Sequence, residues 1–269
     1  MKQYIGVVKN FLLLATSAIA SSMLATLPSQ AATFSSAQTE VAFTRFNQSP
    51  SQTTTDVNTT AIVIAQNGIL QALANAEGLF IVDPTEVSSS SLSEALGAGS
   101  NYLGLAESQA QVIGSFVVNP GTPFYFDFTA TLNLLTAIDN PPAESAKATG
   151  AISFALVDTA SQSILDIFSL IGNLSTPGNN DFLAIQYGGN LTFSNPVTNY
   201  NFGGQQEYAT AYVQGSLQRS FANTTTVSLI ELMSTGATVT APEPSTNLGL
   251  LLSCGVIGFV FRGRASKLS

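Results

Sequence analysis

Apolar and polar residues alternate with a period of two along much of the second half of the chain. In 124–132 (FYFDFTATL), Phe124, Phe126 and Phe128 share one face with two further apolar residues, and the residues between them are polar or amphipathic. This alternation predicts a half-buried strand. The same pattern predicts strands in 152–157, 183–187, 191–193, 208–217 and 227–230.

Turn-rich segments separate these runs at 139–145, 172–181 and 195–206. The turn sequence NPGTP at 119–123 predicts a hairpin between the apolar run 115–118 and the strand that follows it. No segment is long enough for the helical crossovers that a parallel sheet needs. We therefore expect a mainly β domain, an antiparallel β-sandwich of jelly-roll or immunoglobulin-like kind.

The first half of the chain has a less regular pattern. Residues 47–60 are polar and of low complexity, which predicts a flexible lead-in. Residues 61–76 place apolar side chains at helical spacing, which is compatible with a short helix. The serine run 88–91 indicates a loop. The expected organisation is a signal segment at 1–31, a lead-in at 32–105, a β-sandwich at 106–240 and a terminal segment at 241–269.

The N-terminus has the three parts of a secretory signal peptide. Lys2 and Lys9 are basic, 11–27 is mostly apolar, and small residues precede a cleavage point after Ala31. Cleavage after Ala32 fits nearly as well. We therefore expect the protein to be exported.

The C-terminus combines an apolar run with a basic tip. Residues 248–261 form a run of fourteen, about 21 Å long as a helix, against a hydrocarbon core about 30 Å thick. Adding 245–247 and letting Arg262 extend to the lipid surface makes the run almost long enough to cross. Arg262, Arg264 and Lys267 would stay in the cytoplasm. The pattern predicts a transmembrane anchor; the alternative is a last strand followed by a basic tail.

The junction before this run carries the residues of a sorting motif. Pro242, Glu243, Pro244 and Ser245, followed by the apolar run and the arginine-rich tip, resemble the PEP-CTERM sorting signal of exported bacterial proteins. The resemblance implies recognition by exosortase, a membrane protease and transpeptidase, and removal of the anchor near the motif. The segment 115–158 is similar to bodies found in cyanobacterial PEP-CTERM proteins, which implies no assigned activity.

Composition excludes several classes of function. Charged residues make up only 9% of the chain, and between residues 32 and 241 three basic residues stand against fifteen acidic ones. Such a surface repels nucleic acid but tolerates divalent cations and neutral polysaccharide. The chain has no histidine, and its one cysteine, Cys254, lies in the apolar tail. Histidine-based triads, ordinary zinc sites and disulfides are therefore excluded from the body.

The remaining candidates for catalysis are weak. Asp127 paired with Asp139 or Glu144 could act on a glycosidic bond if the two carboxyl groups lay about 5–10 Å apart. Lys147 beside Ser145 could form a Ser–Lys dyad, but its acidic, proline-rich surroundings favour a solvated lysine. We predict no catalytic residue, and therefore a protein that is not an enzyme.

Calcium is the one cofactor with a plausible ligand set. Asn179, Asn180 and Asp181, or Asp139 with Glu144, supply hard oxygens on loops. No segment has the spacing of an established calcium loop, so we predict no metal site and leave a structural calcium ion as the alternative.

These observations predict a non-enzymatic protein of the cell envelope or the extracellular matrix. Its expected partners are an exosortase-like enzyme, the lipid bilayer and extracellular polysaccharide. The alternative is a lectin-like module with a sugar or calcium site, in which Tyr208, Tyr212 or Tyr125 lies beside Asp127 on a concave sheet face. A cryptic hydrolase using Asp127 is the third hypothesis.

Overall fold

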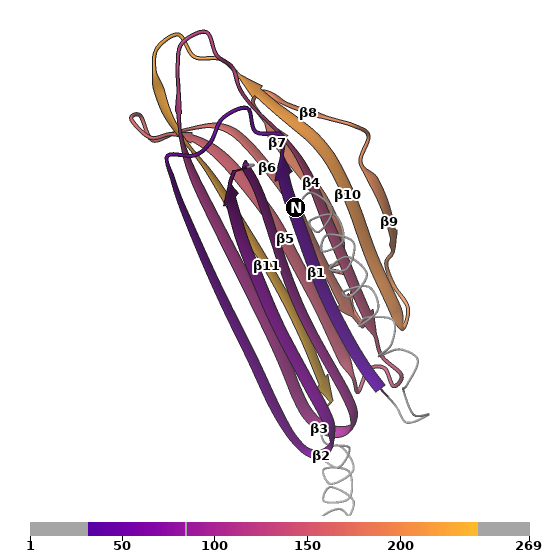
Figure 1. Cartoon of the computed structure of the whole chain (residues 1–269). Helices are drawn as coiled ribbons and strands as arrows, with labels where there is room; N and C mark the ends of the chain where they lie inside the picture. The colour runs from indigo at the N-terminus through magenta and orange to yellow at the C-terminus, as the bar shows by residue number, and fades with distance from the viewer. Residues whose placement is uncertain (1–31, 84, 242–269) are drawn as a thin grey trace, which may run out of the picture.

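The computed structural model describes residues 32–83 and 85–241 (Figure 1). Eleven strands, and no helix, are found in these ranges, and every strand pair is antiparallel. The prediction of a mainly β, antiparallel domain is confirmed. The strands are β1 (Ala32–Thr44), β2 (Gln52–Val82), β3 (Thr85–Val118), β4 (Phe124–Ala137), β5 (Ser145–Asp158), β6 (Ser163–Thr176), β7 (Phe182–Gly188), β8 (Leu191–Phe193), β9 (Val197–Asn201), β10 (Gln206–Arg219) and β11 (Thr225–Ala241).

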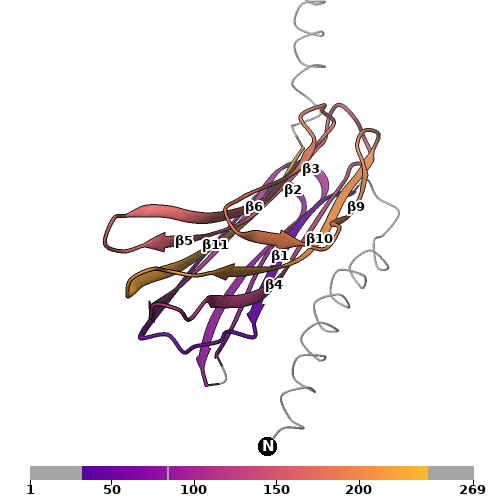
Figure 2. The ribbon, with the colours of Figure 1, turned by 90° about the horizontal axis from the view of Figure 1, so that it is seen from above.

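All strands belong to one curled sheet with the order β7-β6-β5-β11-β3-β1-β4-β10-β8, while β2 also pairs with β3 and β9 with β10. The sheet turns over within β3. Residues 87–98 of β3 pair with β1, and residues 102–118 pair with β11. Figure 2 shows the resulting curve from above. We call the strands on the β1 side of the turn the first layer and those on the β11 side the second layer.

The turn in the sheet is made by a long β2–β3 hairpin that folds back on itself. Gly68 and Gly99 are paired at the bend. Gly99 has a φ of +102°, and a Cβ there would lie 2.7 Å from the carbonyl oxygen of Asn67. Glycine is therefore required at this point. Beyond the bend the two halves of β3 face each other, and Ser93 Oγ lies 3.0 Å from Ser108 Oγ.

Phenylalanine rings fill the space between the layers. Phe126 and Phe128 on β4 are fully buried, as the alternation in 124–132 predicts. Phe154 of β5 meets Phe128 at a centroid distance of 4.8 Å and Phe43 of β1 at 5.1 Å, both edge-to-face. These contacts lock the first layer onto the second.

The layers are also joined by a salt bridge on the side away from the bend. Arg219 Nη1 at the end of β10 lies 3.0 Å from both carboxylate oxygens of Asp166 on β6. The Asp166 side chain is fully buried, and it also accepts a hydrogen bond from the backbone amide of Asn190. This pair fixes the turn between β7 and β8, where the chain passes from one layer to the other.

The predictions for the first half of the chain are wrong. Residues 52–60 of the expected flexible lead-in, and all of the expected helix at 61–76, belong to β2. The serine run 88–91 lies in β3, and the domain boundary expected at 105 falls inside the same strand. Apolar residues occur at helical spacing in 61–76, but the segment is a strand that bends at Gly68. Before the bend the side chains on both faces are exposed, and after it exposed and half-buried side chains alternate. Hydrogen bonding to β3 overrides this local pattern.

The predicted hairpin between 115–118 and β4 is also wrong. The turn at 119–123 exists, with Gly121 at a φ of +77°. However, β3 pairs on its two sides with β2 and β11 at this end, whereas β4 pairs with β1 and β10. The turn therefore carries the chain from the second layer to the first. The tight-turn signal is local and does not distinguish a hairpin from a crossing between layers.

Both ends of the domain lie at one pole. Ala32 pairs with Ala98 and Ala241 pairs with Tyr102, and both partners flank the bend in β3. None of the described residues forms a helix long and apolar enough to cross a membrane. The predicted signal peptide, Pro-Glu-Pro motif, anchor and basic tip lie outside the described residues.

Candidate functional site

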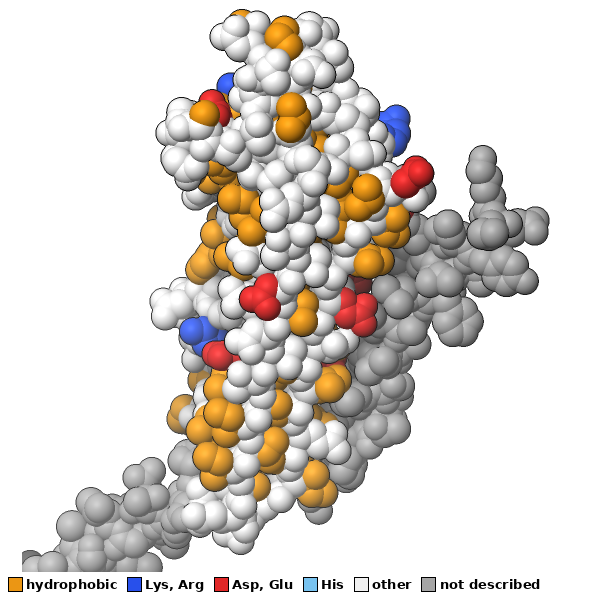
Figure 3. Space-filling view, turned by 60° about the vertical axis from the view of Figure 1, so that its left-hand side comes forward, with side chains coloured by type: hydrophobic (Ala, Val, Ile, Leu, Met, Phe, Trp, Pro, Cys, Tyr) orange, Lys and Arg blue, Asp and Glu red, His pale blue; other side chains and the backbone are white. Residues whose placement is uncertain are grey.

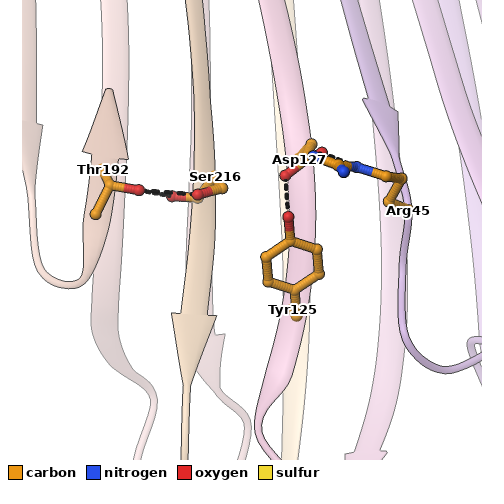
Figure 4. A network of polar contacts seen from close by, with 5 residues as sticks. All are labelled: Arg45, Tyr125, Asp127, Thr192 and Ser216. Atoms are coloured by element: carbon orange, nitrogen blue, oxygen red, sulfur yellow. Dashed lines mark hydrogen bonds and ion pairs between the residues drawn. The ribbon is translucent and has the colours of Figure 1, made fainter. Parts of the chain in front are cut away.

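A row of polar side chains crosses the outer face of the first layer (Figure 4). Asp127 on β4 is its centre: it accepts hydrogen bonds from the Tyr125 hydroxyl and from the Arg45 guanidinium. Ser216 on β10 stands opposite Asp127 in the strand register. Ser216 Oγ lies 2.8 Å from Thr192 Oγ1 on β8. The row thus runs from β8 across β10 and β4 to the end of β1.

The charged groups of this row are paired with each other. Arg45 neutralises Asp127 in an ion pair, and its side chain is 73% exposed. The hydrogen bond to Asp127 raises the pKa of Tyr125, because ionisation of the phenol would place two negative charges side by side. The row offers hydroxyls, a guanidinium and a carboxylate for hydrogen bonding to a polar ligand.

The structure separates the carboxyl groups that a glycosidase would need. Asp127 lies near the start of β4, and Asp139 follows the end of the same strand. Ten extended residues at about 3.3 Å each place more than about 30 Å between them. This is far beyond the 5–10 Å required. The hypothesis of an Asp127 pair with Asp139 or Glu144 is therefore wrong.

Asp139 and Glu144 lie together, but both carboxylates accept hydrogen bonds from backbone amides. Glu144 Oε2 accepts hydrogen bonds from the amides of Asp139 and Asn140 at 3.0 and 2.9 Å. Asp139 Oδ2 accepts one from the Ala32 amide at 2.8 Å. These carboxylates hold the loop after β4 against the start of β1.

The other candidates are not brought together as a site. Lys147 has an exposed side chain on β5, and Ser145 Oγ bonds to Thr240 Oγ1 instead. In the proposed calcium loop, Asp181 accepts the Ser175 amide and the Asn180 carbonyl accepts from Asn173. Within 32–83 and 85–241, no group of three or more acidic, cysteine or histidine side chains could hold a metal ion.

The tyrosines of the lectin hypothesis are spread along the sheet. Tyr212 and Tyr208 on β10 stand opposite Thr131 and Leu135 of β4. These positions lie four and eight residues from Asp127, about 13 and 26 Å along the strand. Only Tyr125 touches Asp127. Of the three tyrosines that the lectin hypothesis offered as alternatives, Tyr125 lies beside Asp127, whereas Tyr208 and Tyr212 do not.

A second polar cluster, which the sequence did not reveal, is buried between the layers. Ser93 Oγ of β3 lies 2.9 Å from Thr235 Oγ1 of β11, and Ser91 Oγ lies 2.8 Å from the same hydroxyl. Ser108 Oγ also bonds to the backbone carbonyl of Leu92 in the facing layer. Because the side chains are small, the layers approach closely enough for side chains to reach the opposite backbone.

Glu231 extends this buried cluster. Its Oε2 accepts a hydrogen bond of 3.1 Å from Ser89 Oγ, while Oε1 has no hydrogen-bonding partner. Burial raises the pKa of Glu231 to about 8. The carboxyl group is therefore mostly protonated at neutral pH, which avoids an unpaired charge in the core. The signal in the sequence was Glu231 on the apolar face that Leu229 and Met233 share.

No family model, curated protein or solved structure matches this chain.

Proposed function

We propose that this is a non-enzymatic exported protein of the cell envelope or extracellular matrix, sorted through its C-terminal segment by an exosortase-type enzyme. The observation that carries the proposal is the common pole of Ala32 and Ala241. The two segments with membrane-directed sequence patterns are attached to these residues. A domain held at one pole stands with its long strands directed away from the lipid.

The bounds of the folded domain support this proposal. β1 begins at Ala32, directly after the predicted cleavage point, and β11 ends at Ala241, directly before Pro242. Proline restricts the residue before it to extended conformations, so Pro242 and Pro244 keep the junction accessible to a protease cleft. Trimming at both predicted points would leave the strands complete. The finer expectation of a jelly-roll or immunoglobulin-like sandwich remains a prediction.

The outer face suits contact with hydrated polysaccharide. Besides Arg45 and Asp127, the row in Figure 4 consists of hydroxyl groups. Such groups exchange hydrogen bonds with sugar hydroxyls without a net charge. In this role the protein would be retained in the matrix by many weak contacts.

Removal of Pro242–Ser269 tests the sorting role. Every strand, including β11, remains in the shortened chain. In a host with an exosortase we expect the full chain in the membrane fraction before processing, and the shortened chain free in the medium. The matched control replaces Arg262, Arg264 and Lys267 with alanine, which keeps the apolar run but removes the cytoplasmic charges. Identical fractionation of the full and shortened chains would rule out the proposal.

A carbohydrate-binding module is the second candidate, favoured by an exposed aromatic pair. Tyr200 and Phe202 stack at a centroid distance of 4.6 Å and an interplanar angle of 15° at the β9 edge. Binding to a glycan array, with and without a chelator, distinguishes a defined sugar or calcium site from passive retention. Tyr200→Ser should abolish binding if this pair forms the platform, whereas Tyr187→Ser, an exposed tyrosine on β7, should not.

A further inference from the structure

The long β2 strand has one free edge. Among the described strands, β2 pairs only with β3, and it does so from Gln52 to Val82. Its other edge therefore presents unpaired amide and carbonyl groups on both sides of the bend. Soluble proteins normally protect such an edge with lysine, proline or a bulge. β2 contains no lysine, arginine or proline, and its only charged residues are Asp56 and Glu77.

The side chains along this edge are exposed and largely apolar. Figure 3 brings this side of the molecule forward and shows two groups of hydrophobic side chains with acidic ones between them. On β2, Ile69 is 68% exposed and Leu79 is 54% exposed. The other large exposed hydrophobic residues of the strand are Val57, Ile62, Val63, Ile64, Leu73, Ile81 and Val82.

The core is incomplete beside this edge. Val57 is paired with the fully buried Ala110 and points to the same interior face, yet it is 49% exposed. The reason is that the second half of β2 packs over the second half of β3. There the side chain of Leu70 lies against Gly104, and the ring of Phe80 lies against Gly114. Among the described strands, none therefore covers the interior face of the first half of β2.

We propose that the β2 edge pairs with β2 of a second copy of this chain. One added strand beside residues 69–82 continues the first layer and covers the exposed interior face of the first half of β2. A twofold related copy supplies such a strand without any other partner. Antiparallel main-chain pairing of a strand with itself satisfies the hydrogen bonds of both edges.

The side chains of β2 are complementary to themselves in this arrangement. With the twofold axis at Ala76, Leu73 faces Leu79 of the second copy, and Glu77 faces Asn75. Opposed residues then point to the same face, as a continuous sheet requires, and no like charges meet. The absence of lysine and arginine from β2 removes the usual barrier to such pairing.

The interface is large enough for a stable dimer. Fourteen residues at about 3.3 Å each span about 46 Å, and two layers are together about 20 Å thick. The contact therefore covers about 900 Å² on each copy, which reaches the roughly 800 Å² per partner of a standard interface.

Lysine substitutions on the edge provide the first test. The exported, processed protein should sediment as a dimer at about 10 μM. Leu73→Lys with Leu79→Lys should shift it to a monomer, because four ammonium groups would meet across the twofold axis. Ile164→Lys is the matched control: Ile164 is 62% exposed on β6, away from the bend, and its substitution should leave the dimer intact. Circular dichroism and melting temperature confirm that each variant is folded.

A cysteine on the axis tests the register. In a Cys254→Ser background, Ala76→Cys places two thiols opposite each other at a Cα separation of about 5 Å, within the range of a disulfide. Mild oxidation should give a covalent dimer. Ala72→Cys, whose twin would lie about 26 Å away, should not cross-link. A monomeric wild-type protein, or a dimer that both edge lysines leave intact, would overturn the proposal. Because these measurements concern the processed domain, they are independent of its route of export.

Discussion

The backbone amide of Ala32 donates a hydrogen bond of 2.8 Å to Oδ2 of Asp139, across 107 residues of sequence. Ala32 is the first residue of β1 and is buried, and Asp139 lies in the loop after β4. If the signal is cut after Ala31, this amide becomes an α-ammonium group beside a carboxylate. The sequence left cleavage after Ala31 and after Ala32 open, and this contact favours the first.

Asp139→Asn should therefore destabilise the mature protein by about 1 kcal/mol, because Asp139 is exposed to solvent and an ion pair with an exposed carboxylate contributes up to about that amount. Urea unfolding of the secreted protein measures the loss, and intact mass gives the N-terminal residue. Asp181→Asn is the control. Asp181 accepts a hydrogen bond of 2.8 Å from the backbone amide of Ser175, but this amide is internal to the chain and stays uncharged after cleavage of the signal. A mature chain beginning at Thr33 would contradict this prediction.

Glu231 should make the protein less stable as the pH rises. Its pKa is about 8 in the folded state and about 4.5 when the group is free in solution. Between these values the folded state holds a proton that the unfolded state has lost, so the free energy of unfolding falls with increasing pH. Below about pH 4.5 the effect is absent, and above about pH 8 it is complete.

Glu231→Gln should reduce this slope, since an amide keeps the shape and has no proton to lose. Thermal melts from pH 4.5 to 8 provide the measurement. Burial also raises the pKa of Glu94, so part of the slope should persist in the variant. Equal slopes in the wild type and Glu231→Gln would show that Glu231 is already ionised in the folded state.

The buried and the exposed arginine pairs should differ in their effect on stability. Arg219→Met leaves the fully buried Asp166 carboxylate without its cation, which should lower the free energy of unfolding by about 3 kcal/mol. Arg45→Met removes the same charge from an exposed pair and should change it by less than about 1 kcal/mol. Guanidinium unfolding of both variants decides the matter. Similar losses would mean that Asp166 is not dependent on its ion pair.

The bend in the β2–β3 hairpin should be sensitive to a single methyl group. Gly99→Ala combines a positive φ with a collision against Asn67, and we expect a loss of roughly 2–4 kcal/mol. Gly121→Ala, also at positive φ but with no atom within 4 Å of the added Cβ, should lose only about 1 kcal/mol. Melting temperatures of the two variants provide the comparison. Equal values would show that the collision of the added methyl group with Asn67 does not contribute to the loss.

Much of the second half of the fold could be predicted from the alternation of apolar and polar residues along the chain. Phe124, Phe126 and Phe128 face the core because a strand places every second side chain on one face. The same argument identified the inward faces of β5 and β10. It failed for 61–76, where exposed edge residues carry no clear alternation, and for 88–93, where serines occupy both faces.

The candidate sites show a similar division. The sequence offered Tyr125 as one possible neighbour of Asp127, and the two side chains are indeed hydrogen-bonded. It could not identify Arg45 or Ser216, because strand register brings residues from β1 and β10 to β4 across long stretches of chain. The buried position of Glu231 was visible in the alternation, but its contact with Ser89 depends on how the sheet turns over.

By itself the sequence determined that the body of this protein is antiparallel β, because a period of two needs only local geometry. It also determined a body poor in basic residues and free of histidine and cysteine. Only the tertiary structure decided that the β2–β3 hairpin folds back, that Ala32 and Ala241 share a pole, and that β2 leaves an edge unpaired. These features depend on which distant strands exchange hydrogen bonds, and the backbone groups that form those bonds are the same in every residue except proline.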